Sequence, residues 1–236
     1  MNVSVKRIQA ILIKDYKEFS RNYAISVMIV FPLLFALLYR SEGSDQAVMY
    51  AFVMNFSLAM LTSFVQACLI AEEKERNTLR SLMMTPASML DVLIGKSSLV
   101  FIISAAVLAI STYLFGFDTS NMLVLIAGLA LSILLYTAIG TICGLYSKSL
   151  IEASLAVFPV LIIFTMGPFA LVFEEDYPIV KVLNYLPSSQ LSELMVALET
   201  GAATSELTSP LVIIAIWTVA LTVISFVLYK KRLKDY

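Results

Sequence analysis

The stretch from 122 to 146 reads MLVLIAGLALSILLYTAIGTICGLY and contains no charged side chain. A helix crosses the hydrocarbon core of a bilayer with about 20 mostly apolar residues, so this stretch is long enough to span a membrane. The composition agrees, because 60% of the 236 residues are hydrophobic and only 14% are charged. A soluble domain of this length carries more charge than that. The sequence therefore predicts an integral membrane protein.

Five further apolar stretches flank this one. They cover residues 23–39, 47–71, 92–117, 151–173 and 210–229. Charged residues are almost absent inside them, as the cost of an ion in hydrocarbon requires. Pro32, Pro159 and the Gly167-Pro168 pair are expected to kink or break the first and fifth spans. We expect an all-α membrane protein, residues 1–236, with six transmembrane helices in one domain.

The distribution of basic residues predicts the orientation. Loops rich in lysine and arginine stay in the cytoplasm. If both termini are cytoplasmic, fourteen of the sixteen lysines and arginines lie on the inner side, and only Arg40 and Lys181 lie outside. We therefore expect a multi-pass protein of the cell membrane, of bacterial type, with both termini in the cytoplasm. The net charge of −1 gives no support for nucleic-acid binding.

Two non-spanning segments have helical patterns. In residues 1–21 the apolar side chains share one face and the basic ones the other, which predicts an amphipathic helix in the cytoplasmic interface. Residues 174–209 form the last outer segment, in which Ser188 or Ser189 can cap a short helix and Gly201 can end it. We expect this helix to be extracellular and partly re-entrant. The apolar stripes are, in the first segment, Val5, Ile8, Leu12, Tyr16 and Phe19, and in the second, Leu191, Leu194, Met195 and Leu198.

The loop 72–91 between the second and third spans is longer and more charged than a simple connection needs. It reads EEKERNTLRSLMMTPASMLD. Asn77 or Thr78 can cap a short helix that Pro86 would end. A capped, charged cytoplasmic helix is suited to docking a partner.

Several enzyme classes are excluded or disfavoured. The chain has no histidine, which removes histidine triads and histidine metal sites. Gly95-Lys96-Ser97 is not a phosphate-binding loop, because position 90 is Leu90 rather than glycine. Lys96 is instead expected to anchor the third span by extending to the interface. The Glu72-Glu73 pair resembles part of an intramembrane protease motif, but the histidines that complete such a site are missing.

The whole arrangement resembles the membrane subunit of an ABC-2 type (type V fold) ABC transporter. The most specific part is Glu-x-x-x-x-Thr-Leu-x-x-Leu-x-x-x-Pro followed by Gly-Lys. Here this pattern is carried by Glu73, Thr78, Leu79, Leu82, Pro86, Gly95 and Lys96.

The resemblance implies a permease that has no ATPase site of its own. Two such subunits would pair, either as two copies or with a related permease, and cytoplasmic ABC ATPase subunits would bind ATP and Mg²⁺. No cofactor is expected on this chain. The loop 72–91 would be the coupling element and the N-terminal helix a second docking surface. The residues expected to couple to the ATPase are Glu72, Glu73, Arg76, Thr78, Leu79, Arg80, Leu82, Pro86, Arg7 and Lys14.

The cargo is indicated only by the composition of three spans. A surface rich in methionine and phenylalanine adapts to hydrophobic molecules. The translocation path is expected to include Phe31, Phe35, Met54, Phe56, Phe158 and Phe164. The compact size resembles exporters of amphipathic peptides, lantibiotics or hydrophobic drugs. The alternatives are a channel or secondary carrier that works without ATP, and a membrane anchor or sensor that transports nothing.

The orientation can be tested by labelling. In a variant without its two native cysteines, Thr78→Cys should react with a membrane-impermeant maleimide only when the cytoplasmic face is accessible. Labelling of Thr78→Cys on intact cells would contradict the topology.

Overall fold

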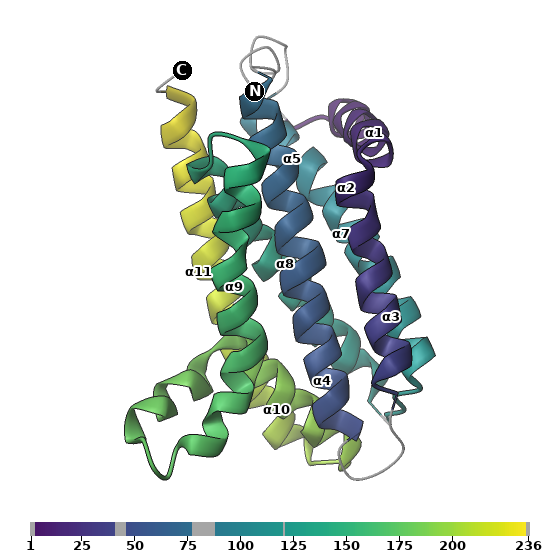
Figure 1. The fold of residues 1–236 in the computed structure, drawn as a ribbon, viewed down its shortest axis with the longest axis vertical. Coiled ribbons are helices and arrows are strands. Elements are labelled where there is room, and N and C mark those ends of the chain that lie inside the picture. Colours follow the sequence, from purple (N-terminus) through teal and green to yellow (C-terminus); the bar gives the residue numbers. More distant parts are fainter. Residues whose placement is uncertain (1–2, 41–45, 77–87, 120, 235–236) are drawn as a thin grey trace.

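The structure is a computed structural model that describes residues 3–40, 46–76, 88–119 and 121–234. Within these residues the chain is helical and forms no strand. Long helices run side by side along the molecule, and shorter ones lie across its two ends (Figure 1). The prediction of an all-α protein is confirmed.

Five helices are long and apolar enough to cross a membrane. The first is a continuous rod of α4 (Gln46–Ser57), the π-helical η2 (Leu58–Ser63) and α5 (Phe64–Glu75). The others are α7 (Met89–Phe115), α8 (Met122–Tyr146), α9 (Leu150–Ala170) and α11 (Thr204–Lys234). They match the second to sixth predicted spans. Helix α9 runs through Pro159 and Pro168 without a break.

The first predicted span is shorter than expected. It consists of α2 (Tyr23–Ser26), the 3₁₀ turn η1 (Val27–Ile29) and α3 (Val30–Leu38), packed against α7 and α4 (Figure 1). Pro32 cannot donate a hydrogen bond to the preceding turn, and the 3₁₀ turn lies just before it. At 1.5 Å per residue the segment is about 24 Å long, less than the hydrocarbon thickness of about 30 Å. The count of six spans therefore stays a prediction.

Helix α1 (Val5–Arg21) lies across one end of the bundle, where the C-terminal end of α11 also lies (Figure 1). Its buried residues are Ile11, Asp15 and Phe19, spaced by one turn. The predicted apolar stripe is only partly buried, because Val5 and Tyr16 are exposed. The buried face is displaced from the apolar stripe because Asp15 pairs with charges on neighbouring helices.

The opposite end carries η3 (Leu171–Phe173), η4 (Pro178–Tyr185) and α10 (Pro187–Glu199). Helix α10 lies across this end and packs against α4, α8, α9 and α11 (Figure 1). It begins at Pro187 rather than after a serine cap, because proline suits the first helical turn. Gly201 follows the helix with φ of 66°, as expected of a helix stop. The predicted stripe is buried at all four positions, Leu191, Leu194, Met195 and Leu198.

Two glycines let α8 approach the central rod closely. A Cβ added at Gly144 would lie 2.7 Å from the carbonyl oxygen of Ala67, and one at Gly140 would lie 2.8 Å from the Cβ of Gln66. These separations are too short for real carbon atoms. The glycine pair therefore serves helix packing, the interpretation that small residues at this spacing favour.

Replacing Gly140 by leucine should destabilise the bundle by about 1–3 kcal/mol, the usual cost of overpacking. The thermal midpoint in detergent would report this loss. Ala127→Leu is the matched control, because Ala127 lies on the same helix and is exposed. Equal midpoints for the two variants would show that α8 does not pack on the rod in this way.

Candidate functional site

A buried cluster of four charged side chains joins three helices near the α1 end. Lys96 of α7 places its Nζ 2.9 Å from Glu73 Oε1 at the end of α5 and 3.4 Å from Asp15 Oδ2 of α1. Lys14 also pairs with Glu73 and lies 3.3 Å from Asp15 Oδ1. The two lysines therefore match the two buried carboxylates in charge, and the partly exposed Glu18 adds a third carboxylate 3.2 Å from Lys14 at the edge of the cluster.

The balance of positive and negative charges matters because most of this cluster is buried. Asp15 and Lys96 are fully buried, and Glu73 is 2% exposed. Burial raises the pKa of Asp15, although Lys96 acts in the opposite direction. Burial lowers the pKa of Lys14, but the carboxylates of Glu73 and Asp15 outweigh this and hold the pKa above its usual value. A buried charge that lost its partner would be left without solvent or counter-charge.

A second set of contacts fastens α1 to α7 one turn earlier. Asp91 accepts hydrogen bonds from Arg7 Nε and from the backbone N–H of Ser4, each at 2.8 Å. It also completes a capping box with Ser88, which fixes the start of α7. Between the two sets of contacts, a Cβ at Gly95 would lie 2.8 Å from Ile11 Cγ2. Glycine at 95 therefore allows the close approach that brings Lys96 to Asp15.

The structure corrects the expectation for Lys96. Its side chain turns inward and is 1% exposed, so it does not extend to the interface. The pairing with Glu73 provides a physical reason for two parts of the sequence pattern, the glutamate before the loop and the Gly-Lys after it. Asp15 was missed, because it was not among the residues for which the sequence suggested a role. Its spacing of four residues from Ile11 and Phe19 was the available signal.

The carboxylates of Asp15, Glu18 and Glu73 lie close enough together to hold a metal ion. However, the ammonium groups of Lys14 and Lys96 already lie against them. A cation would have to compete with both lysines. The cluster is therefore suited to holding helices together rather than to metal binding.

The end of α5 is also fastened to α8 and α9. Lys74 Nζ donates to the carbonyl oxygens of Leu145 and Ser147, where α8 ends. Glu75 accepts a hydrogen bond of 2.9 Å from the backbone N–H of Leu150, at the start of α9. With the Glu73 contacts, three consecutive residues connect α5 to α1, α7, α8 and α9. We call residues 73–75 the stem of the loop that follows.

The expected coupling residues fall into two groups. Thr78, Leu79, Arg80, Leu82 and Pro86 lie outside the described residues. Among the others, Glu72 pairs with Arg76 at 2.7 Å, and Arg76 is largely exposed. Arg7, Lys14 and Glu73 make the ion pairs described above, within the chain.

The six path residues do not line one surface. Met54 is buried in the main core, whereas Phe31 and Phe158 are exposed on the outside. The rings of Phe35 and Phe56 are in contact, tilted by 54° with centroids 4.6 Å apart, and Phe164 packs edge-on against Tyr136.

A cavity of about 740 Å³ lies at the α10 end instead, between α4, α9, α10 and α11. Its lining includes Phe52, which contacts the predicted residue Phe56, and Phe169, which contacts Phe52. A volume of this size suits a drug-sized molecule.

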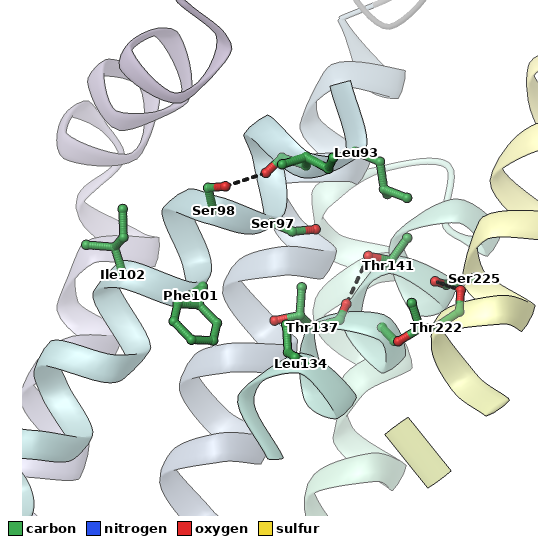
Figure 2. A pocket seen from close by; sticks show the side chains of 12 residues that line it. Leu93, Ser97, Ser98, Phe101, Ile102, Leu134, Thr137, Thr141, Thr222 and Ser225 are labelled. Atoms are coloured by element: carbon green, nitrogen blue, oxygen red, sulfur yellow. Dashed lines mark hydrogen bonds between the residues drawn. The ribbon is translucent and has the colours of Figure 1, made fainter. Parts of the chain in front are cut away.

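A second cavity of about 410 Å³ lies between α7, α8 and α11 and is lined by several hydroxyl groups (Figure 2). Figure 2 shows Ser98 bonded to the carbonyl oxygen of Ile94 and Thr141 to that of Thr137. Thr137 and Ser225 likewise donate to carbonyls of their own helices. These hydroxyls are satisfied within the protein, so this cavity does not require a polar ligand.

The fold thus defines a polytopic helical membrane protein whose charged groups concentrate at one end. A family profile described as ABC-2 family transporter protein matches residues 2–227. The chain therefore belongs to the ABC-2 transporter family and is a permease of the ABC transporter class. No curated protein sequence matches it significantly.

Lys96→Met should be the most damaging single substitution in the charged cluster. It leaves two buried carboxylates facing one lysine, which costs about 3–5 kcal/mol. Unfolding in mixed micelles, followed by circular dichroism, would measure the loss. Lys148→Met is the control, since Lys148 is exposed at the same end.

The double variant Asp15→Asn/Lys96→Met restores the charge balance and should recover part of the lost stability. If the double variant is less stable than Lys96→Met by the full effect of Asp15→Asn alone, the two side chains do not interact.

Proposed function

We propose that the chain is the permease subunit of an ATP-driven exporter. It forms the translocation path as a dimer and couples to separate cytoplasmic ATPase subunits, which bind ATP and Mg²⁺. Membership of the ABC-2 family supports this assignment. The observation that carries the coupling role is the stem, because its three residues connect the loop to four helices.

The contacts of the stem can transmit a movement of the loop to the helix bundle. The loop 77–87 follows α5 directly, so a force on it reaches residues 73–75 first. Their ion pairs and hydrogen bonds then act on α1, α7, α8 and α9 together. A partner that binds the loop differently in its two nucleotide states can in this way shift the permease between two conformations.

The charge distribution supports a cytoplasmic position for the α1 end. Fourteen of the sixteen basic residues belong to segments assigned to this side, which satisfies the positive-inside rule. A polar groove of about 390 Å³ lies there between α1 and the end of α5, lined by Lys17, Arg21 and Arg76 among others. Glu18 and Glu72 line the same groove, so it presents charges of both signs, and α1 is proposed as the second docking surface for a partner with matching charges.

The buried cluster argues against the alternative of a gradient-driven carrier. Such a carrier needs a carboxylate that binds and releases a proton or sodium ion during transport. Asp15 and Glu73 are each held by two lysines instead. Energy from a partner ATPase fits this arrangement better.

The outer surface of α9 supports the dimer. Large apolar side chains, including Phe158, are exposed along it, and Phe31 of α3 is exposed as well. A second copy or a related permease could cover these side chains and complete the path. The cargo proposed is an amphipathic peptide, a lantibiotic or a hydrophobic drug.

Leu79→Asp tests the coupling role. A charge at an apolar anchor should weaken ATPase docking and reduce transport about tenfold or more, while the isolated permease keeps its stability. Transport into inverted vesicles and ATP hydrolysis by the assembled complex would be measured together. Leu79→Met, which keeps the apolar character, should transport normally. Normal transport by Leu79→Asp would contradict the proposed function.

A further inference from the structure

The cavity at the α10 end contains buried polar atoms that no part of the described chain satisfies. Asn55 Oδ1, Thr165 Oγ1 and Ser189 Oγ have no hydrogen-bond partner, and all three residues line the cavity. Each residue is at least nine-tenths buried, with exposures of 1%, 1% and 5%. They come from three different helices, α4, α9 and α10. Buried polar groups are normally paired, so unpaired groups on residues that line a cavity point to a ligand.

The orientation of the Asn55 amide makes its free atom an acceptor. Its Nδ2 donates to the carbonyl oxygen of Ser188 and to Ser192 Oγ, each at 3.1 Å. A carbonyl oxygen can only accept, so the nitrogen must face Ser188. The oxygen Oδ1 is therefore the atom left without a donor.

The charges that line the cavity are negative. Glu193 of α10 and Glu206 of α11 contribute carboxylates, and no lysine or arginine is among the described residues that line this cavity. Gln190 Nε2 donates one hydrogen bond of 3.1 Å to Glu193, which leaves further acceptor capacity on that carboxylate. The N-terminus of α10 adds only about half a positive charge. The net field favours a cation.

Much of the remaining lining is apolar, which favours a ligand with an apolar body. Phe52 of α4 and Phe169 of α9 meet edge to face with centroids 5.7 Å apart, and Pro168 and Val196 lie beside the same cavity. A single metal ion would leave most of the volume of about 740 Å³ unfilled. A molecule with an apolar body and a charged hydrogen-bond donor would use both kinds of surface, with the aromatic rings adding attraction for the cation.

We propose that this cavity binds organic cations that carry a protonated amine on an apolar body. The ammonium donates its N–H groups to the acceptors of Asn55, Thr165 and Ser189, and its positive charge offsets part of the negative charge of Glu193 and Glu206. The inference names the class of cargo, and in that respect it rests on the proposed function.

The test compares two probes with the full-length permease in nanodiscs of neutral phosphatidylcholine. Dansylcadaverine carries a primary ammonium on an apolar fluorophore, and its N-acetyl derivative keeps the fluorophore but loses the charge. Fluorescence anisotropy should show saturable binding of dansylcadaverine and binding of the acetyl derivative at least about tenfold weaker.

The double variant Glu193→Gln/Glu206→Gln should weaken dansylcadaverine binding about tenfold, because it removes both charges. Thr165→Val tests the buried hydroxyl without changing the side-chain volume and should also weaken binding. Glu199→Gln is the matched control, because Glu199 is an exposed acid of α10 that does not line the cavity. Since Glu193 and Glu206 are themselves exposed, their variants should fold normally.

Equal affinity for both probes, the absence of saturable binding, or unchanged binding in the double variant would each overturn the inference. None of these results depends on an ATPase. If dansylcadaverine does not bind but Leu79→Asp reduces transport as expected, only the cargo class is refuted. Specific binding together with normal transport by Leu79→Asp would refute only the coupling role.

Discussion

The structure depends on a balanced set of charges buried where α1, α5 and α7 meet. Lys96 and Lys14 neutralise Glu73 and Asp15, and all of these side chains except the partly exposed Lys14 are buried. Such a cluster contributes little net stability compared with apolar packing, but it penalises any arrangement that separates its members. It therefore fixes how these three helices lie relative to one another. The apolar contacts along the bundle would tolerate sliding far more readily.

The buried charges at one end of the molecule are connected to the cavity at the other end by a single helical rod. The helix that carries Glu73 continues through η2 into α4, where Asn55 binds α10 through Ser188 and Ser192. One rod therefore runs from the stem at the charged end to the acceptor-lined cavity at the other. A shift of the stem would move Asn55 and the cavity with it, unless η2 absorbs the change. A π-helical segment in the middle of a helix is often found at functional sites.

The sequence predicted the fold better than the site. Five spans and the buried stripe of α10 followed from the length and periodicity of the apolar stretches. The start of α10 was wrong because serine caps were preferred over proline in the first turn. The inward position of Lys96 could not be read from one sequence, because it depends on Asp15 and Glu73 meeting it from two distant segments. The cavity was missed for the same reason, as its polar lining comes from four helices.

The distance between α1 and α7 tests directly whether the charged cluster fixes these two helices relative to each other. Spin labels at Gln9→Cys and Ile94→Cys, both exposed positions, would report the distance between the two helices in nanodiscs after the native cysteines are replaced. The account predicts a single narrow distance distribution in the otherwise native chain and a broad one when Lys96 is replaced by methionine. Equally narrow distributions in both proteins would contradict it, because α1 would then be held in place without the buried charges.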